Sequence, residues 1–568
     1  MLGVQLGGLL DDASPGADEA LDLVAGFDDA LVHGFARLGE ERAAALGSLA
    51  GALASSPLGP AVEEAVGKVA AGSISERHLT VLAGARSALF GAVHDARLAG
   101  LDAALGRERA GWEPGDTVPD PVSANLLGGC RSWLHELAIT GWRGVDHDLV
   151  SAADQTIEAL LAEPGLRRLA VLLDGLAAEL RASCPIATAA TVPALRWADL
   201  WSRAMLLAHK RPWPATAKPV RGDVPPHPLA AGSAESEPVP RDGVPAAGSA
   251  GSEAVQGDDP PGSAGSEAAQ GDDLRAAGSA GSEALRGDVS LGSVGGEAAQ
   301  GDDLRAAGSE ALRGDNPPAA AGGEMVSGRL LILGADVHEH ATAVQVQVHA
   351  VFEPSDGSAR RLVRVSVAAA KVDTIVGPAV WNLLEGHPVL LTALAERRSL
   401  TVEALALLPG GDLLWQDDRA EAGEAADPFA TARLQLTGAL APAVPPLDRH
   451  PVRIAEPVLV EGYTVDGGSL NLDGNVLPLD LDRLPACGPI TRELVAASSS
   501  CIGLLRWDGG RWALQPLAVQ ATVKRKPVEA HNGDWALGPT DPKVVKAEAR
   551  SGDAVAVLRE RAGRLLRK

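Results

Sequence analysis

The residues whose types and spacing could best support chemistry lie in an Asp-Val-His-Glu-His run at positions 336–340. Alternate side chains of an extended chain point to the same face, so we expect His338 and His340 to lie side by side. Two imidazoles on one face can hold zinc or another borderline metal. A catalytic site would need a third ligand, and no residue at a diagnostic spacing supplies one. His338 and His340 are therefore candidate metal ligands, and the alternative is a solvated turn between strands.

Other short patterns point to structure more than to chemistry. The Asp-His-Asp run at 146–148 stands where a helix is expected to begin, so it is interpreted as a helix cap. Asp480 and Asp482 alternate with leucines, which is typical of a half-buried strand. The sequence contains no P-loop, no GxGxxG after a strand and no GxSxG elbow. We therefore assign no catalytic residue and no cofactor site.

Residues 1–218 show helical periodicity. Apolar side chains recur at intervals of three and four, as from Leu166 through Leu173 to Leu180, and predict an all-α bundle or helical array. Trp197 and Trp201 share one face of the last expected helix. They are candidates for partner binding, and core packing is the alternative.

Residues 219–324 contain no aromatic residue, Ile, Met or Cys, so they cannot bury enough apolar surface to offset the entropy of ordering. Gly-Ser-Glu or Gly-Gly-Glu recurs at 251, 265, 281, 295 and 308, each time followed by Gly-Asp. The segment holds 18 acidic and 6 basic residues, a net charge of −12 out of −24 for the whole chain. These features predict a disordered, low-complexity repeat, which we call the acidic linker.

From residue 325 the period changes to two. Alternating apolar residues, Pro-Gly-Gly at 409–411 and Asp-Gly-Gly at 508–510 indicate hairpins. Residues 325–568 are therefore expected to form a β-rich domain, a sandwich or a partly open barrel with a few helices. A further boundary is expected near 417–427.

The chain is expected to end in a basic amphipathic helix. Its arginines are Arg559, Arg561, Arg564 and Arg567. Cations near a helix C-terminus are favoured by the backbone dipole alone. The alternative is docking to an acidic partner or to the acidic linker of the same chain.

Composition bounds the class of protein. Four scattered cysteines show no metal or redox spacing and fit reduced thiols in a cytoplasm, and excess Ala, Gly and Arg suggest a high-GC bacterial gene. We expect no signal peptide and no membrane span, because Met1–Ser14 lacks a basic start and no run of 18 apolar residues occurs. A negative chain with few basic clusters does not favour nucleic-acid binding.

Two hypotheses follow. The first is a non-enzymatic scaffold, adaptor or accessory subunit that tethers two protein partners, on their own or as parts of a larger assembly, through the acidic linker. The alternative is a metal-dependent hydrolase or small-ligand-binding enzyme with its site in the C-terminal half. The sequence specifies neither the partners nor the oligomeric state.

Overall fold

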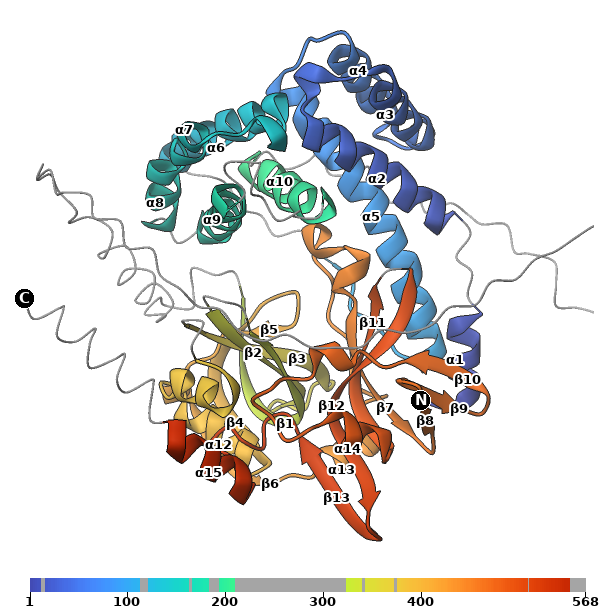
Figure 1. Ribbon diagram of the computed structural model, residues 1–568, viewed down its shortest axis with the longest axis vertical. Coiled ribbons are helices and arrows are strands. Elements are labelled where there is room, and N and C mark those ends of the chain that lie inside the picture. Colours follow the sequence, from blue (N-terminus) through green and yellow to red (C-terminus); the bar gives the residue numbers. More distant parts are fainter. Residues whose placement is uncertain are drawn as a thin grey trace, which may run out of the picture. The chain divides into compact units, whose positions relative to one another are not determined.

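A computed structural model describes residues 1–11, 16–112, 121–162, 166–182, 194–209, 323–339, 343–371, 375–508 and 510–551 (Figure 1). Residues 219–322 of the acidic linker lie outside these ranges, as do His340 and the four terminal arginines. The N-terminal helical region and the C-terminal β-rich region belong to one compact unit. Both predicted classes of secondary structure are confirmed.

The N-terminal region is helical. Ser75 caps the longest of its described helices by accepting a hydrogen bond from the His78 N–H. Asp146 caps α7 by accepting from the Leu149 N–H at 2.8 Å, which confirms the cap interpretation. The helices are α1 Gly3–Leu10, α2 Ala17–His33, α3 Glu40–Leu53, α4 Gly59–Ala70, α5 Glu76–Leu105, α6 Pro121–Thr140, α7 His147–Ser151, α8 Asp154–Ala162, α9 Arg167–Ala182 and α10 Ala194–Ala208.

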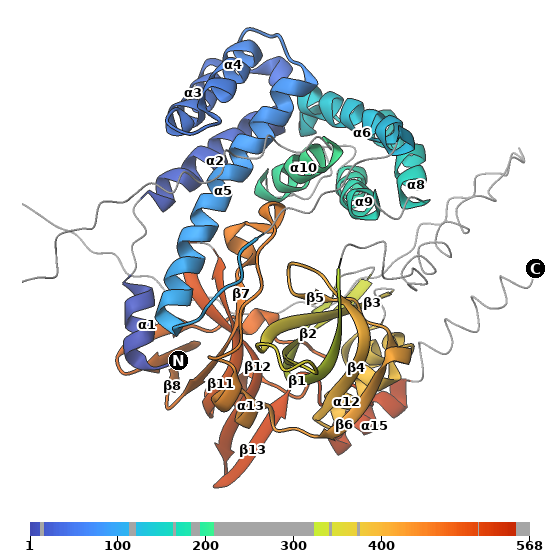
Figure 2. The ribbon, with the colours of Figure 1, turned by 180° about the vertical axis from the view of Figure 1, so that it is seen from behind.

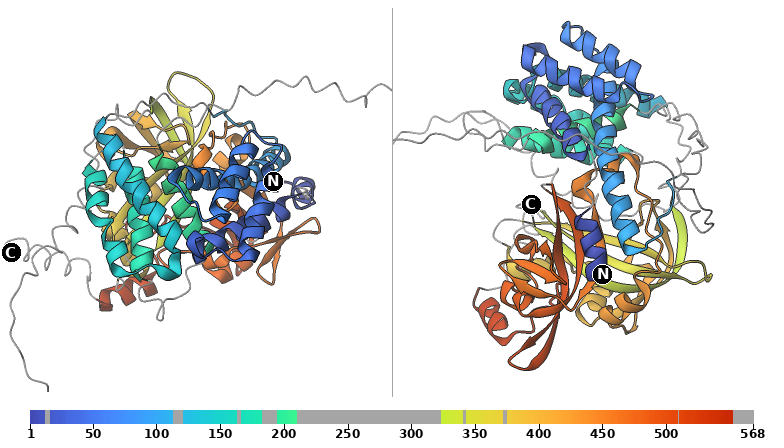
Figure 3. Two further views of the ribbon diagram at one scale, coloured as in Figure 1. Left: turned by 90° about the horizontal axis from the view of Figure 1, so that it is seen from above. Right: turned by 90° about the vertical axis from the view of Figure 1, so that its right-hand side faces the viewer.

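Helix α5 connects two cores. Leu79 and Leu82, near its start, are fully buried among the other helices of the N-terminal region. Leu98 and Leu101, near its end, belong instead to a buried cluster of the C-terminal region. Figures 2 and 3 show α5 running from the helices to the strands beside α1. Helix α5, which is 30 residues long, therefore contributes side chains to the cores of both regions.

The first β unit is a closed barrel, which we call barrel 1. Its order is β1-β2-β3-β5-β4, and β4 pairs back with the first half of β1. β3 and β5 run parallel, whereas the other neighbours are antiparallel. Helix α12 (Pro388–Ala395) lies between β3 and β4 in the chain, and β6 (Ala420–Ala425) extends the sheet beside β4. The strands are β1 Glu324–Glu339, β2 Ala343–Pro354, β3 Arg361–Ala370, β4 Arg398–Leu407 and β5 Asp412–Leu413.

The second unit, barrel 2, repeats this order. Its first strand is broken at Gly462 into β7, which pairs with β11, and β8, which pairs with β9. β9 pairs with β10, a parallel bridge between Leu479 and Leu514 joins the end of β10 to β12, and β12 pairs with β11. Helix α14 (Arg492–Ala496) again precedes the fourth strand. The strands are β7 Ala455–Glu461, β8 Thr464–Asp466, β9 Ser469–Leu472, β10 Asn475–Pro478, β11 Ser498–Asp508, β12 Arg511–Val523 and β13 Lys526–His531.

Both barrels therefore have the strand order 1-2-3-5-4-1 with a helix between strands 3 and 4. This is the five-stranded Greek-key arrangement of OB-type barrels. The turn between strands 4 and 5 ends on Gly411 in barrel 1 and on Gly510 in barrel 2, with φ of +82° and +79°. The β-rich region is thus a pair of barrels built on one plan.

The two barrels pack on each other through a small apolar cluster. It contains Leu331 and Leu333 of β1, Ile502 of β11, Ala518 of β12 and Phe429 of α13 (Pro428–Gln435). Gly334 lies where β1 approaches β12, and a Cβ at this position would come within 2.7 Å of Leu517 Cβ. The passage between the barrels runs from 426 to 454, after the polar run at 417–427 where the sequence places a boundary.

Charged residues after α5 join the helical region to the start of barrel 2. Arg107 donates to Glu456 at 2.8 Å and to the Pro457 carbonyl at 2.9 Å. Arg109 lies 3.1 Å from the other oxygen of Glu456 and forms two hydrogen bonds to Asp102. The two halves of the chain therefore contact each other directly.

Short 3₁₀ segments connect several of these elements. Gly377–Leu384 is a 3₁₀ helix, and β7 follows the 3₁₀ turn Pro451–Arg453. Asp480 and Asp482 do not lie in a strand, because β10 ends at Pro478, and they pair with Arg483 and Arg492. Asp541 precedes a short helix, α15 (Pro542–Ser551), and within the described residues no helix combines the length and apolarity needed to cross a membrane.

Candidate functional site

Strands β1, β2 and β3 of barrel 1 present polar side chains on the face opposite the barrel interior. In the β-ladder, Asp336 lies opposite Gln347, which lies opposite Ser366, and His338 lies opposite Gln345. Directly opposite residues point to the same side of a sheet. Their neighbours, such as Val337, Val346 and Val367, fill the barrel core. We call this surface the polar face: Asp336, His338, Gln345, Gln347, His349, Arg364 and Ser366.

Asp336 is the buried anchor of the polar face. Its side chain is 1% exposed and accepts hydrogen bonds from Arg506 at 2.7 Å and from Gln515 at 2.6 Å. Burial alone would raise the pKa of Asp336, but the hydrogen bond from His338 and the charge of Arg506 outweigh it and lower the pKa to about 2. Because Arg506 and Gln515 belong to β11 and β12, this carboxylate also ties barrel 1 to barrel 2.

His338 is held by that carboxylate. Its Nε2 atom lies 2.7 Å from Asp336 Oδ2, while the side chain remains 33% exposed. A buried carboxylate that orients a partly exposed imidazole is an arrangement that can serve proton transfer. The metal hypothesis remains a prediction, because His340 lies outside the described residues. Across the described part of the chain, no three His, Cys, Asp or Glu side chains gather closely enough to hold a metal ion.

His349 and Arg364 continue the polar face toward the turn between β4 and β5. His349 is 2% exposed, and its Nε2 atom has no hydrogen-bond partner among the described residues. Burial, followed by the charge of Arg364, lowers the pKa of His349 to about 3, so the ring is neutral. Arg364 donates to the Gly410 carbonyl at 2.9 Å and to Asp412 at 3.0 Å, which fixes the turn.

A groove of about 530 Å³ lies beside this turn. Pro409 and Gly411 of the turn, Arg361 of β3 and Ala441 of the segment after α13 contribute to its wall. Its volume is in the range of ligand sites. Its lining is mainly apolar, and the polar side chains in it are Ser358 and the ion pair of Arg361 with Glu324 at 2.6 Å. Barrel 1 therefore carries a hydrogen-bonding face and, beside the turn between β4 and β5, a mainly apolar groove.

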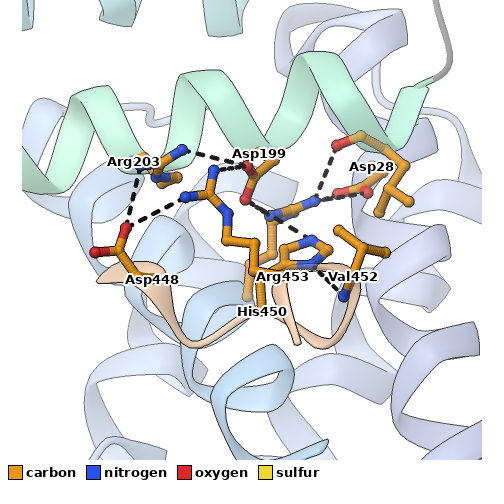
Figure 4. A network of polar contacts seen from close by, with 9 residues as sticks. Asp28, Asp199, Arg203, Asp448, His450, Val452 and Arg453 are labelled. Atoms are coloured by element: carbon orange, nitrogen blue, oxygen red, sulfur yellow. Dashed lines mark hydrogen bonds and ion pairs between the residues drawn. The ribbon is translucent and has the colours of Figure 1, made fainter. Parts of the chain in front are cut away.

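A second polar cluster joins the helical region to the segment that precedes barrel 2 (Figure 4). At its centre, the buried Arg86 of α5 donates to both oxygens of Asp28 at 2.6 and 3.0 Å and lies 3.6 Å from Asp199 of α10. Burial raises the pKa of Asp28 to about 6, and the charge of Arg86 opposes that rise. We call this cluster the interface network: Asp28, Arg86, Asp199, Arg203, Asp448, His450 and Arg453.

The segment at 446–453 supplies the other side of the interface network. Arg453 and His450 reach Asp199 at 3.5 and 3.8 Å, and Asp448 lies 3.4 Å from Arg203 (Figure 4). The His450 ring stacks on Phe90 with centroids 4.1 Å apart. Burial lowers the pKa of His450 to about 4, so this imidazole is neutral near pH 7. Because three carboxylates face three arginines, we assign the interface network to holding the halves together.

The remaining candidate residues are not brought to either cluster. Trp197 and Trp201 are 1% and 0% exposed in the helical core, and Trp201 donates to the Leu134 carbonyl at 2.9 Å. Their burial agrees with core packing and leaves no accessible docking face at these indoles. The arginines at 559, 561, 564 and 567 lie outside the described residues. Cys130, Cys487 and Cys501 are free and buried.

The hydrogen-bond partners of Asp336 could not be predicted from the sequence. Arg506 and Gln515 lie about 170 and 180 positions later, and no local pattern links them to β1. One signal was present: each is a polar residue between apolar neighbours in its strand. A buried charge of this kind requires a partner, so it marks a candidate cluster.

Comparison of the chain with models of protein families, with curated proteins and with solved structures yields no match. The description of the two barrels therefore rests on their strand pairing alone.

Proposed function

We propose that the chain is a non-enzymatic scaffold or accessory subunit of a bacterial cytoplasmic assembly, and that barrel 1 binds a protein partner through the polar face. The observation that carries this proposal is the exposure of uncharged hydrogen-bonding groups on strands 2 and 3: Gln345 and Ser366 are exposed and Gln347 is half-buried. Strands 2 and 3 form the face through which OB-type barrels bind their ligands, which are oligonucleotides and oligosaccharides in the well-described cases. This part of the support is fold analogy.

The direct contact between the halves refines the adaptor hypothesis. Arg107 and the interface network connect the helical region to barrel 2, so the distance between two partners would be set by this interface and not by the length of the acidic linker. A partner on barrel 1 and a second partner on the helical region would be held in a fixed arrangement. Such an arrangement favours simultaneous binding when the two sites match the geometry of the assembly.

The test compares capture by three forms of the full chain from a lysate of the source organism. Ser366→Arg places a large charge on the polar face, whereas Thr401→Arg makes the same change at an exposed position of β4 in the same barrel. We expect a partner that binds the wild type and the Thr401 variant and is lost from the Ser366 variant. A partner retained by all three, or none retained by the wild type, would contradict the proposal.

A second candidate function rests on the Asp336–His338 pair. Its 2.7 Å contact and the partial exposure of the imidazole favour a hydrolase or small-ligand-binding enzyme, metal-dependent if His340 joins as a ligand. Metal content of the purified chain and hydrolase activity toward ester, amide and phosphate substrates would test it. His338→Ala should abolish both metal and activity, and the scaffold proposal predicts that neither is present in the wild type.

A further inference from the structure

Strands β12 and β13 form a hairpin whose tip stands clear of barrel 2. The strands pair from Ala518 with His531 to Val523 with Lys526. Both residues of the first pair are buried, whereas every residue from 522 to 527 is exposed. Figures 1 and 2 show the β13 end projecting beyond the neighbouring strands. The tip is therefore available to a binding partner.

The tip concentrates positive charge that the described residues do not neutralise. Lys524, Arg525 and Lys526 are consecutive, and no ion pair of theirs is found within the ranges that the structure describes. The arginines beside the base of the hairpin behave differently. Arg397 pairs with Glu529 and Asp534, and Arg433 pairs with Glu461. In an acidic protein, three unpaired adjacent cations are a site for a negatively charged ligand. We call this site the basic tip.

The backbone conformation of the basic tip is unfavourable for the residue types that occupy it. Lys524 and Arg525 form a two-residue turn in which both have positive φ, +51° and +66°. Asn-Gly and Gly-Gly adopt this turn with the least conformational strain. The equivalent two-residue turn between β8 and β9 does use glycines, Gly467 and Gly468, at φ of +55° and +82°. Long cationic side chains thus occupy positions where local conformation favours smaller residues, which fits a role for their charge.

The chain itself contains an acidic segment of complementary charge. Residues 219–323 hold 17 acidic and 6 basic residues, 6 − 17 = −11. A carboxylate on the same chain meets the basic tip at a far higher effective concentration than a separate molecule would. Individual exposed ion pairs are weak and screened by salt, so several must act together and the contact must be reversible.

We propose that the basic tip, Lys524, Arg525 and Lys526, is the docking point for the acidic linker of the same chain. This surface is distinct from the polar face, so its role is independent of the proposed function. An acidic partner protein or a nucleic acid would be an alternative occupant, and the test below separates them from the linker.

The test is zero-length carbodiimide cross-linking of the dilute full chain, in which a carboxylate and a lysine amine form an amide bond after activation. A 1:1 mixture of ¹⁴N- and ¹⁵N-labelled protein separates links within a chain from links between chains. We expect Lys524 and Lys526 to couple to residues 219–323 of their own chain at low salt, with several-fold lower yield in 0.5 M NaCl. Lys543 and Lys546, also exposed, serve as internal controls.

The matched variant is Lys524→Asn with Arg525→Gly, which removes two charges while installing the preferred turn. We expect its thermal stability to equal or exceed that of the wild type, and the cross-links at Lys526 to fall at least threefold. Equal yields at Lys526 in the variant, equal yields at the control lysines, or links that form mainly between chains would overturn the proposal. Linker links lost only when nucleic acid or another protein is added would identify a competing occupant and still support the site.

Discussion

Barrel 1 buries its core largely under a helix of its own sequence, whereas barrel 2 relies on helices from the other end of the chain. Leu390 and Leu394 of α12 pack among the inward residues of barrel 1. The corresponding helix of barrel 2, α14, contributes Val495, and the cluster is extended by Leu6 and Leu9 of α1 and by Leu98 and Leu101 of α5. Strands β8, β9 and β10 are short, so they cannot close the core of barrel 2 alone.

This difference shows that the acidic linker does not separate two independent folding units. A chain cut within the linker and separated into halves would leave the leucines of barrel 2 without their partners from α1 and α5. Experiments on binding should therefore use the full chain. The following predictions test this contrast between the barrels, in order of decreasing effect.

The largest effect is expected at Leu101, which is fully buried. Leu101→Ala should lower the free energy of unfolding by about 3–4 kcal/mol, because it removes buried methyl groups and leaves a cavity. This loss of stability should extend to barrel 2, although Leu101 lies in helix α5. Hydrogen exchange measured by mass spectrometry should rise in β7 and β12.

The matched control is Leu390→Ala in α12, which removes an equally buried leucine from the core of barrel 1. Exchange should then rise in β2 and β4, with little change in β7. If Leu101→Ala raised exchange only within α2–α10, the assignment of α5 to the core of barrel 2 would be wrong.

A smaller effect is expected where the two barrels meet. Asp336→Asn should cost about 2 kcal/mol at pH 7, because it leaves Arg506 largely buried without a counter-charge. The folded-state pKa of Asp336 is about 2, below its ordinary value of 3.8. Its contribution is therefore present above about pH 3.8 and is lost as the pH falls toward 2.

Chemical denaturation across this pH range measures both effects. The wild type should lose more stability on acidification than the Asn variant. Asp412→Asn breaks a more exposed pair with Arg364 and should cost less than about 1 kcal/mol. Equal costs for the two variants would show that Asp336 does not join the barrels.

Mild acidification should remove the contribution that His450 makes to the interface network. The pKa of His450 is lowered from 6.5 to about 4, so its contribution to stability is present above pH 6.5 and is lost as the pH falls through 4. We expect the titration of His450 by itself to remove about 1–2 kcal/mol between pH 7 and 5. Asp28, with its pKa raised to about 6, acts in the opposite sense: its contribution is present at low pH and is lost as the pH rises through 6.

The measurement is therefore the difference between the wild type and His450→Gln, since Asp28 is common to both. The variant should show a flatter pH profile of unfolding between pH 7 and 5. Parallel profiles would indicate that His450 titrates normally and is not buried against Phe90.

Local features of the fold could be predicted from the sequence, and long-range ones could not. Period-two alternation located β2 and β3, and the Gly-rich turns located the β4–β5 and β11–β12 hairpins. Barrel closure was not predictable, because the pairing of Leu330 with Leu400 joins strands far apart in the sequence. For the same reason His338 was identified but its partner network was not: Arg506 and Gln515 reach Asp336 only after both barrels have formed.

The smallest effect concerns how each barrel starts the helix between strands 3 and 4. Thr491 caps α14 by accepting a hydrogen bond from the Leu494 N–H at 3.2 Å. Helix α12 begins with Pro388 and its preceding residue makes no cap, but the distant Asp417 accepts from the Val389 N–H at 3.2 Å. Thr491→Ala should cost about 1 kcal/mol, because the N–H of Leu494 loses its acceptor. Pro388→Ala acts mainly by raising the entropy of the unfolded chain and should cost about 0.5 kcal/mol. Thermal unfolding of both variants measures the difference. Helix α14 is one turn long, and its cap is one of few local interactions that fix it. A larger cost for Pro388→Ala than for Thr491→Ala would show that the Thr491 cap contributes little to α14.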